Sequence, residues 1–352
     1  MIIPIYTRYC IKARGLITIN RVKDTKISDL DMKKSTKNNN NKSLSYAYID
    51  SDAILEANSL FVGEGAKISK GVEIRADKVH IGFGVEIKEN VKIGLSEIKP
   101  GTEIFIGDYT VIHNNVRASV PICIIGDYGT IHEQAVIYGD KKCVIGHNCW
   151  VGQNTVLNSK AELIIRDNFR IGVQSQVWTH VASGELIEGC KMYKVAPTII
   201  EDDVWLVGHV IVSPGLAIAK KTVVFPGSVV TKDTLPGHCY SGTPAQDITE
   251  KYNPYNPVTL KEKFDMMKKW VDEFVEVNPQ YKKLIWVTEN VENLKSFPEN
   301  SVIFTQGINK IKDVTPKVTF FDLETKKYTK RRSPTEIAII KYLMGHRARF
   351  TP

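Results

Sequence analysis

The stretch WTHVASGELIEGCKMYKVAP, residues 178–197, holds four side chains that could do chemistry. An imidazole such as that of His180 titrates near neutral pH, so it could act as a general base and take a proton from an attacking nucleophile. Cys190 could instead be a covalent nucleophile, although a lone cysteine in such a stretch is more often simply packed. Trp178 and Glu185 flank the histidine and could contact a substrate, although packing and solvent exposure are the commoner roles of these residue types.

The chain on both sides of this stretch repeats an aliphatic residue at every sixth position. A helix would repeat at about 3.6 residues and a flat strand at 2.0, so neither explains a period of six. The positions are Val62/Ile68/Ile74, Ile81/Ile87/Ile93, Ile106/Ile112/Ala118, Ile125/Ile131/Ile137, Ile145/Val151/Leu157, Ile165/Ile171/Val177, Ile200/Leu206/Val212 and Ile218/Val224/Val230.

These groups of three predict a solenoid with coils of about eighteen residues and three flat faces, stacked at about 4.8 Å per coil. One coil cannot bury its apolar face alone, whereas a stack of about eight coils can. Every insertion falls between groups and never within one, so all of them emerge from the same corner. The longest insertion is the stretch that holds His180. Long excursions from a repeat fold usually line its working face, so we expect the functional site there.

The repeat has [LIV]-[GAED]-x-x-[STAV]-x character, and its last coils carry DDVWLVGHVIVSPG, GSVVTKD and SGTPA after the MY…P-T-I segment at Met192–Ile199. In these features the chain resembles the hexapeptide-repeat acyltransferases, and within them the galactoside and maltose O-acetyltransferase branch. The resemblance implies a left-handed parallel β-helix, acetyl-CoA as acyl donor, and a homotrimer with active sites between subunits.

The resemblance also implies roles for single residues. His180 matches the catalytic base of the family, and Trp205 matches a tryptophan near the acyl end of the cofactor. Backbone groups at Gly208 and Pro226 match positions that bind the pantetheine arm. Thr231 and Lys232 match a pair near the adenine and its 3′-phosphate. We expect Trp178 and Glu185 to contact the acceptor, and the Gly208 N–H to stabilise an oxyanion.

The sequence also departs from the family pattern. Gln246 and Thr249 stand where arginines often help to bind the CoA phosphates, and Lys251 is a nearby substitute. Val207, Ala219 and Phe225 replace glycines that usually follow the aliphatic position, and Pro226 replaces an alanine. The stretch around His180 is not that of a galactoside enzyme, so the acceptor is left open.

The γ-class carbonic anhydrases share this fold and need three histidines around zinc, two of them five residues apart. No two histidines of this sequence have that spacing, so no metal is expected. His113 and His132 each follow an inward aliphatic residue and are interpreted as exposed face residues, and His209 as structural or pocket-lining.

We expect three regions: an N-terminal cap with an Asn/Lys-rich linker (residues 1–55), the repeat domain (56–250) and a small α+β domain (251–352). In the last region, residues 260–277 have the apolar stripe of an amphipathic helix. Short strands are expected at 284–287, 301–304 and 317–323, and a final helix begins after Ser333 with Pro334 in its first turn.

The composition limits the compartment and the partners. The 352-residue chain has a formal net charge of +8, but its basic residues are not interleaved with aromatics on a known nucleic-acid-binding module, so no nucleic-acid partner is expected. No apolar run approaches the length of about 18 residues that a membrane span needs. The six cysteines lack CxxC spacing, which favours a reduced cytoplasm over a disulfide framework or zinc ribbon.

The sequence therefore predicts an acetyl-CoA-dependent O-acetyltransferase that acts on a carbohydrate, such as a unit of a surface glycan. Two alternatives stay open. One is an N-acyltransferase that acts on an amino sugar nucleotide, and the other is a β-helix scaffold without catalysis.

Overall fold

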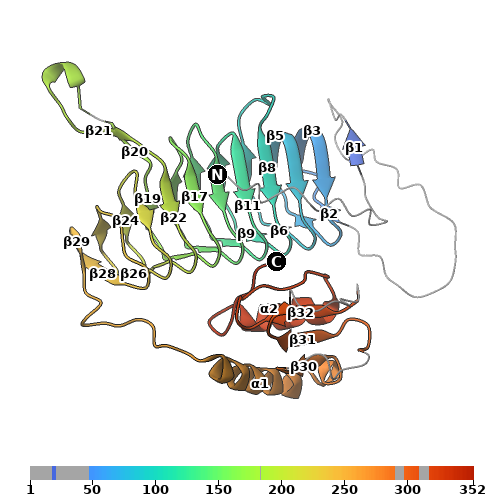
Figure 1. Cartoon of the computed structure of the whole chain (residues 1–352). Helices are drawn as coiled ribbons and strands as arrows, with labels where there is room; N and C mark the ends of the chain where they lie inside the picture. The colour runs from blue at the N-terminus through green and yellow to red at the C-terminus, as the bar shows by residue number, and fades with distance from the viewer. Residues whose placement is uncertain (1–17, 21–46, 183, 290–296, 309–316) are drawn as a thin grey trace. The chain divides into compact units, whose positions relative to one another are not determined.

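The computed structural model describes residues 18–20, 47–182, 184–289, 297–308 and 317–352 (Figure 1). The chain divides into two compact units, Met1–Ile248 and Thr249–Pro352. Most of the expected N-terminal cap and linker lies outside the described residues. Its strand β1 (Thr18–Asn20) pairs antiparallel with β3 (Ile54–Val62).

The first unit is a parallel β-solenoid whose strands form three ladders, one for each strand position in a coil (Figure 1). The first ladder contains the end of β3, the end of β5 (Glu73–Ile81), β8 (Glu103–Ile106), β11 (Ile122–Ile125), β14 (Cys143–Ile145), β17 (Leu163–Ile165), β22 (Thr198–Ile200) and β25 (Ala217–Ile218).

The second ladder contains β2 (Tyr48–Ile49), β4 (Lys67–Ile68), β6 (Glu86–Ile87), β9 (Val111–Ile112), β12 (Thr130–Ile131), β15 (Trp150–Val151), β18 (Arg170–Ile171), β23 (Trp205–Leu206), β26 (Val223–Val224) and β28 (Cys239–Gly242), which pairs antiparallel with β29 (Ala245–Asp247). The third contains the starts of β3 and β5, then β7 (Lys92–Gly94), β10 (Arg117–Ser119), β13 (Val136–Tyr138), β16 (Val156–Asn158), β19 (Gln176–Val177), β24 (Ile211–Val212) and β27 (Val229–Val230).

The six-residue period gives this fold because each inward aliphatic residue stacks on its counterpart in the next coil. Ile112 pairs with Ile131, which pairs with Val151, and all three are fully buried. Burying such a side chain contributes about 1.5–3 kcal/mol, so a regular stack of them holds the coils together.

The stack is longer than the expected eight coils, so that number is wrong. Ile49 and Leu55 continue the stack before the first predicted group, and Tyr240 continues it after the last. The second ladder accordingly contains ten parallel strands among the described residues, from β2 to β28. Tyr240 escaped the six-residue count because it follows Val230 by ten residues. Ile49 and Leu55 keep the spacing of six, and Leu55 precedes Val62 by seven residues, as Ile74 precedes Ile81, so the same count could have included them.

Two corners of each coil turn through residues with positive φ. The second corner, between the second and third ladders, has Asn90, Asn115, Gln134, Asn154, Gln174 and His209, with φ between 51° and 61°. Asparagine is among the few side chains that adopt this left-handed conformation readily. His209 occupies this corner position, which gives it a backbone role in the turn. The third corner, between the third ladder and the next coil, carries the insertions instead.

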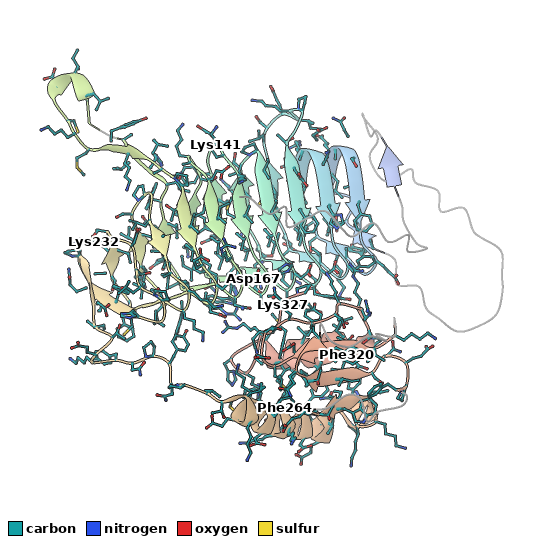
Figure 2. The ribbon with its side chains drawn as sticks, viewed as in Figure 1. Lys141, Asp167, Lys232, Phe264, Phe320 and Lys327 are labelled. Carbon is teal, nitrogen blue, oxygen red and sulfur yellow. The ribbon has the colours of Figure 1, made fainter. Side chains whose placement is uncertain are left out.

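The second unit has two helices and a three-stranded parallel sheet among its described residues. These are α1 (Leu260–Val277), η3 (Pro279–Tyr281), β30 (Ile285–Val287), β31 (Val302–Thr305), β32 (Thr319–Asp322) and α2 (Pro334–Leu343). They coincide with the elements expected from the sequence. The apolar stripe of α1 buries Phe264 and Phe274, and Figure 2 shows Phe264 and Phe320 in this unit. Within the described parts of the chain, no helix combines the length and apolar character needed to cross a bilayer.

Candidate active site

The stretch that interrupts the repeat folds as a β-hairpin at the third corner. Its strands are β20 (His180–Ala182) and β21 (Tyr193–Val195), and η2 (Leu186–Glu188) lies at its tip. Figure 1 shows this hairpin projecting away from the coils. His180 pairs with Val195 at the base of the hairpin, so the histidine stays next to the solenoid while the tip extends outward.

The imidazole of His180 is held by a buried amide. Its Nδ1 lies 2.9 Å from Oδ1 of Asn158, whose side chain is only 1% exposed. The N–H groups of Lys160 and Thr179 donate to the same oxygen, at 3.3 and 3.4 Å, which fixes the orientation of the amide. Because an amide oxygen only accepts, His180 must carry its proton on Nδ1 and keep the lone pair on Nε2. A neutral imidazole in this tautomer is ready to accept a proton at Nε2.

Sequence reasoning missed Asn158. It lies at the end of β16, one coil before Trp178, because Leu157 pairs with Val177. A search for polar residues one coil away from His180 would have found it. The amide also receives the Thr179 hydroxyl at 2.8 Å and donates to the Tyr138 carbonyl at 3.4 Å, so its position is fixed by both coils.

The two expected acceptor residues lie at opposite ends of the hairpin. Trp178 is beside His180, with ring centroids 5.8 Å apart, and its Nε1 donates to Gln176 at 3.0 Å. Glu185 is exposed at the start of η2, and no contact joins its carboxylate to His180 among the described residues. One chain therefore places Trp178 at the imidazole and Glu185 away from it.

Cys190 supports the tip of the hairpin. Its sulfur accepts a hydrogen bond from the Met192 N–H at 3.4 Å, and a Cβ added to Gly184 would lie 2.3 Å from that sulfur. Of the described cysteines, only Cys190 is not fully buried, and burial raises the pKa of the Cys123 thiol to about 12. No contact joins Cys190 to the imidazole in the described part of the chain, so the geometry does not favour the covalent route.

The expected cofactor residues lie on the last coils, but at two different corners: Trp205, Gly208 and Pro226 at the second ladder and second corner, and Thr231 and Lys232 at the third corner after β27. Trp205 stands on the outer side of β23 and is 48% exposed. Gly208 follows at the second corner, where its carbonyl accepts from the Gly227 N–H of the next coil at 3.3 Å. Pro226 is exposed beside it, and exposed Thr231 and Lys232 follow β27 (Figure 2).

Gly208 leaves this surface open. A Cβ added there would meet its nearest heavy atom only at 3.8 Å, and no acceptor for its N–H lies among the described residues. An N–H without an intramolecular acceptor on a rigid coil suits the stabilisation of developing negative charge.

The histidine and the cofactor residues do not meet within one chain. His180 leaves from the third corner, whereas Trp205 and Gly208 belong to the second ladder and second corner. No contact between the two groups is present in the described residues.

Comparisons with known proteins bear on the family. No family model matches the chain. The galactoside O-acetyltransferase of Escherichia coli (strain K12) is 33% identical over 108 residues, which cover 30% of this chain and 53% of that protein. The galactoside O-acetyltransferase of Lactococcus lactis subsp. lactis (strain IL1403) is 30% identical over 141 residues, 39% of this chain and 65% of that protein. Over part of its length, the chain is therefore similar to these O-acetyltransferases.

This hexapeptide-repeat protein spans about half to two thirds of the length of these curated relatives. Among solved structures, it is similar to a mutant of AntD, an N-acyltransferase from Bacillus cereus in complex with dTDP and coenzyme A. That similarity has a TM-score of 0.33 and 18% identity, and covers 47% of this chain and 93% of the other.

Proposed function

We propose that this hexapeptide-repeat protein is an O-acetyltransferase that uses acetyl-CoA and acts on a carbohydrate, with His180 as general base. The observation that carries the proposal is the contact between His180 Nδ1 and Asn158 Oδ1, which leaves Nε2 free to take a proton. The relatives named galactoside O-acetyltransferase support O-acetyl transfer and a carbohydrate acceptor.

The chain offers residues that could hold each end of the acyl donor, acetyl-CoA. Acetyl-CoA supplies an activated acetyl thioester when it is bound. Trp205 and the backbone at Gly208 and Pro226 would hold its acyl and pantetheine portions, because these groups form an open, partly apolar surface. Thr231 and Lys232 would hold the adenine end, where a lysine ammonium can pair with a phosphate.

In the reaction, His180 Nε2 takes the proton of an acceptor hydroxyl as its oxygen attacks the acetyl carbonyl. The Gly208 N–H donates to the carbonyl oxygen as negative charge develops there. The imidazolium then returns its proton to the departing sulfur, which leaves as the free thiol. The base ends the cycle neutral, and no acyl-enzyme forms.

A homotrimer with sites between subunits is part of the proposal. It would bring the third corner of one chain to the second corner of the next, which supplies the contact that a single chain lacks. The outer side of the first ladder supports association, because consecutive coils place apolar or aromatic side chains in register. This outer ladder consists of Phe61, His80, Phe105, Ile124, Val144, Ile164, Ile199 and Ala217.

The hairpin tip gives a second reason to propose that subunits associate. Leu186 and Ile187 are 63% and 89% exposed, and Met192 and Tyr193 are 67% and 59% exposed. Apolar groups gathered on a projecting hairpin are typical of a surface that a neighbouring subunit covers. Such a hairpin would also deliver Glu185 to the site of a neighbouring chain. The left-handed sense of the solenoid and a cytoplasmic location belong to the same proposal.

An N-acyltransferase is the second candidate. The 2,3,4,5-tetrahydropyridine-2,6-dicarboxylate N-acetyltransferase of Staphylococcus aureus (strain JH9) is 33% identical over 72 residues. The same base could deprotonate an amine, so the site chemistry does not separate the two candidates. Mild alkali does separate them, because an ester product is cleaved and an amide product survives.

The test is thiol release from acetyl-CoA with a panel of sugars and amino sugar nucleotides, together with calorimetric CoA binding. His180→Ala is expected to reduce turnover by about 10²–10⁴-fold and to leave CoA binding intact. Near-normal turnover in that variant would remove the base assignment. Absence of CoA binding in the unmodified protein would favour the scaffold alternative.

A further inference from the structure

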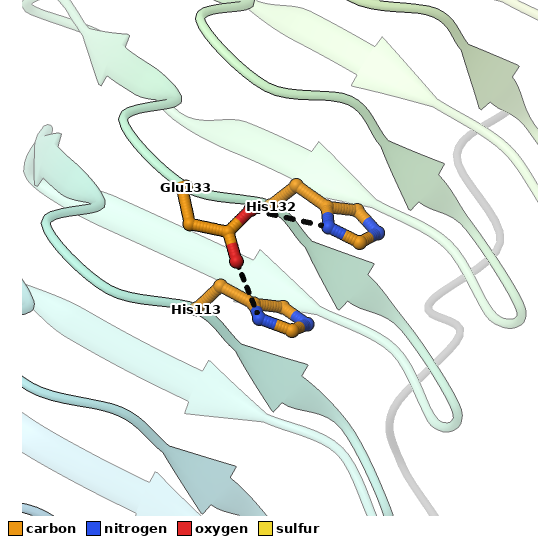
Figure 3. A group of neighbouring side chains, drawn as sticks. All are labelled: His113, His132 and Glu133. Carbon is orange, nitrogen blue, oxygen red and sulfur yellow. Dashed lines mark ion pairs between the residues drawn. The ribbon is translucent and has the colours of Figure 1, made fainter.

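Two histidines and a glutamate meet at the second corner of two consecutive coils (Figure 3). His113 follows β9 and His132 follows β12, and the pairing of Ile112 with Ile131 sets the two imidazoles side by side. Their ring centroids lie 4.5 Å apart with planes 12° from parallel. Trp150 continues this stack on the next coil, with its ring centroid 4.7 Å from that of His132.

Both imidazoles turn the same nitrogen toward one carboxylate. Nδ1 of His113 lies 3.0 Å from Oε1 of Glu133, and Nδ1 of His132 lies 3.4 Å from Oε2 (Figure 3). The three potential ligand atoms all fall within 4.8 Å of one another. A tetrahedral zinc ion with bonds of about 2.0–2.2 Å separates its ligands by about 3.3 Å, which is close to the two nitrogen–oxygen distances.

The chemistry of this group also suits a divalent metal. Metals bind the neutral imidazole, and both rings present Nδ1 toward the carboxylate of Glu133. The carboxylate provides one negative charge against the metal's two positive charges. The side chains of His113, His132 and Glu133 are 27%, 17% and 39% exposed, so an ion can enter and water can complete its coordination.

We propose that His113, His132 and Glu133 form a binding site for Zn²⁺ that links two consecutive coils of the solenoid. Two imidazoles and one carboxylate are a ligand set that zinc accepts with an open fourth position. The rings must tilt from their parallel arrangement to share one ion, and the broad χ2 torsion of histidine allows such a rotation. The site is independent of the proposed acetyl transfer.

The test uses the full chain without a histidine tag, freed of metal by a chelator. Its Cys10→Ser/Cys190→Ser background removes the partly exposed thiol of Cys190 and that of Cys10, which lies outside the described residues. Zn²⁺ is titrated in competition with a fluorescent chelator, and Co²⁺ is titrated by its visible absorption. We expect one equivalent per chain and a tetrahedral Co²⁺ spectrum without thiolate charge transfer. His113→Gln, His132→Gln and Glu133→Gln should each weaken binding by about tenfold or more.

The matched control is His238→Gln. His238 forms a histidine–carboxylate pair with Asp247, at 2.7 Å and with a similarly exposed side chain, but is not in the three-ligand cluster. This control should bind Zn²⁺ as tightly as the background protein. If one equivalent does not bind, or if His132→Gln and His238→Gln lose affinity equally, the proposal is wrong and the cluster is a hydrogen-bonded ladder.

Thermal unfolding gives a second readout, because a ligand that binds only the folded chain raises its unfolding temperature. Zn²⁺ should raise it for the background protein and for His238→Gln, and should raise it less for Glu133→Gln. Glu133→Gln keeps the size of an exposed side chain, so it tests the site even if a histidine variant fails to fold. An equal rise in Glu133→Gln would overturn the proposal.

Discussion

Nδ1 of His180 lies 2.9 Å from Oδ1 of Asn158, and this amide oxygen already accepts from two backbone N–H groups. The arrangement assigns Asn158 as a positioning residue, because it sets the tautomer of the imidazole without needing to touch a substrate. It also holds His180, the proposed base, against the preceding coil of the solenoid, so the ring is oriented before any ligand binds.

Replacing Asn158 should therefore change catalysis more than cofactor binding. We expect Asn158→Ala to lower kcat on the order of a hundredfold, since the imidazole loses its orientation, while the Kd for CoA stays constant. Steady-state kinetics and calorimetry measure the two quantities separately. A parallel loss of CoA binding would mean that Asn158 only supports the local structure.

Asn158→Asp provides the conservative comparison. A carboxylate still accepts from Nδ1, and its negative charge holds the imidazolium more firmly. The acid limb of the kcat/KM profile should therefore move to higher pH, with more activity at alkaline pH than Asn158→Ala retains. If the acid limb of the kcat/KM profile does not move, residue 158 does not influence the protonation of His180.

Mixing two inactive variants tests whether the site lies between subunits. His180→Ala and Trp205→Ala chains, unfolded together and refolded, should recover about a quarter of the unmodified activity. Random trimers place an intact histidine beside an intact tryptophan at that fraction of sites. Each variant refolded alone is the control and should stay inactive at the same acetyl-CoA concentration. Activity no greater than that of the separate variants would contradict a shared site.

Lys232 should recognise the 3′-phosphate of CoA. We expect Lys232→Ala to weaken CoA binding about tenfold and to leave the binding of dephospho-CoA unchanged, because that analogue lacks the phosphate. Added salt should reduce the preference of the unmodified protein for CoA, since exposed charges are screened. Lys220→Ala is the matched control, because Lys220 is also exposed but lies at the first corner and pairs with Asp202. An equal loss in both variants would indicate general charge attraction.

The second unit should lose stability as the pH rises. Burial raises the pKa of Glu336, although its Oε2 accepts from the Thr319 hydroxyl at 2.7 Å and from two backbone N–H groups. Above the ordinary glutamate pKa the unfolded chain releases this proton while the folded chain keeps it. The folded unit is therefore destabilised progressively until the pH passes the raised folded value.

Glu336→Gln should remove this dependence, because the amide oxygen can keep the three hydrogen bonds. Its amino group replaces Oε1, which has no partner within the described structure. Hydrogen exchange across 319–343, corrected for the intrinsic rate, measures the change in the full chain. Lys341→Gln, an exposed change on the same helix, should retain the slope. A slope in Glu336→Gln equal to that of the unmodified chain would show that another group titrates.

The period of six placed Ile112, Ile131 and Val151 in one inward stack before any coordinates, and the structure confirms that pairing. The same count located the hairpin, because an insertion shows up as a break in a regular repeat. It did not extend to Tyr240, which follows Val230 by ten residues, whereas Ile49 and Leu55 keep the spacing of six and could have been included. Asn158 escaped notice because its role depends on which side chain lies one coil away.

The sequence by itself determined the solenoid, its inward residues and the corner at which the hairpin with His180 begins. The reason is that apolar side chains repeating every six residues are buried together when the chain forms stacked three-sided coils. Only the tertiary structure decided which polar groups meet. It set Asn158 against His180, joined His113 and His132 through Glu133, and kept Trp205 away from the histidine. The physical reason is strand register. Because the coils differ in length, the spacing in the sequence does not tell which residues of neighbouring coils lie side by side. Only the pairing of strands in the assembled ladders fixes those neighbours.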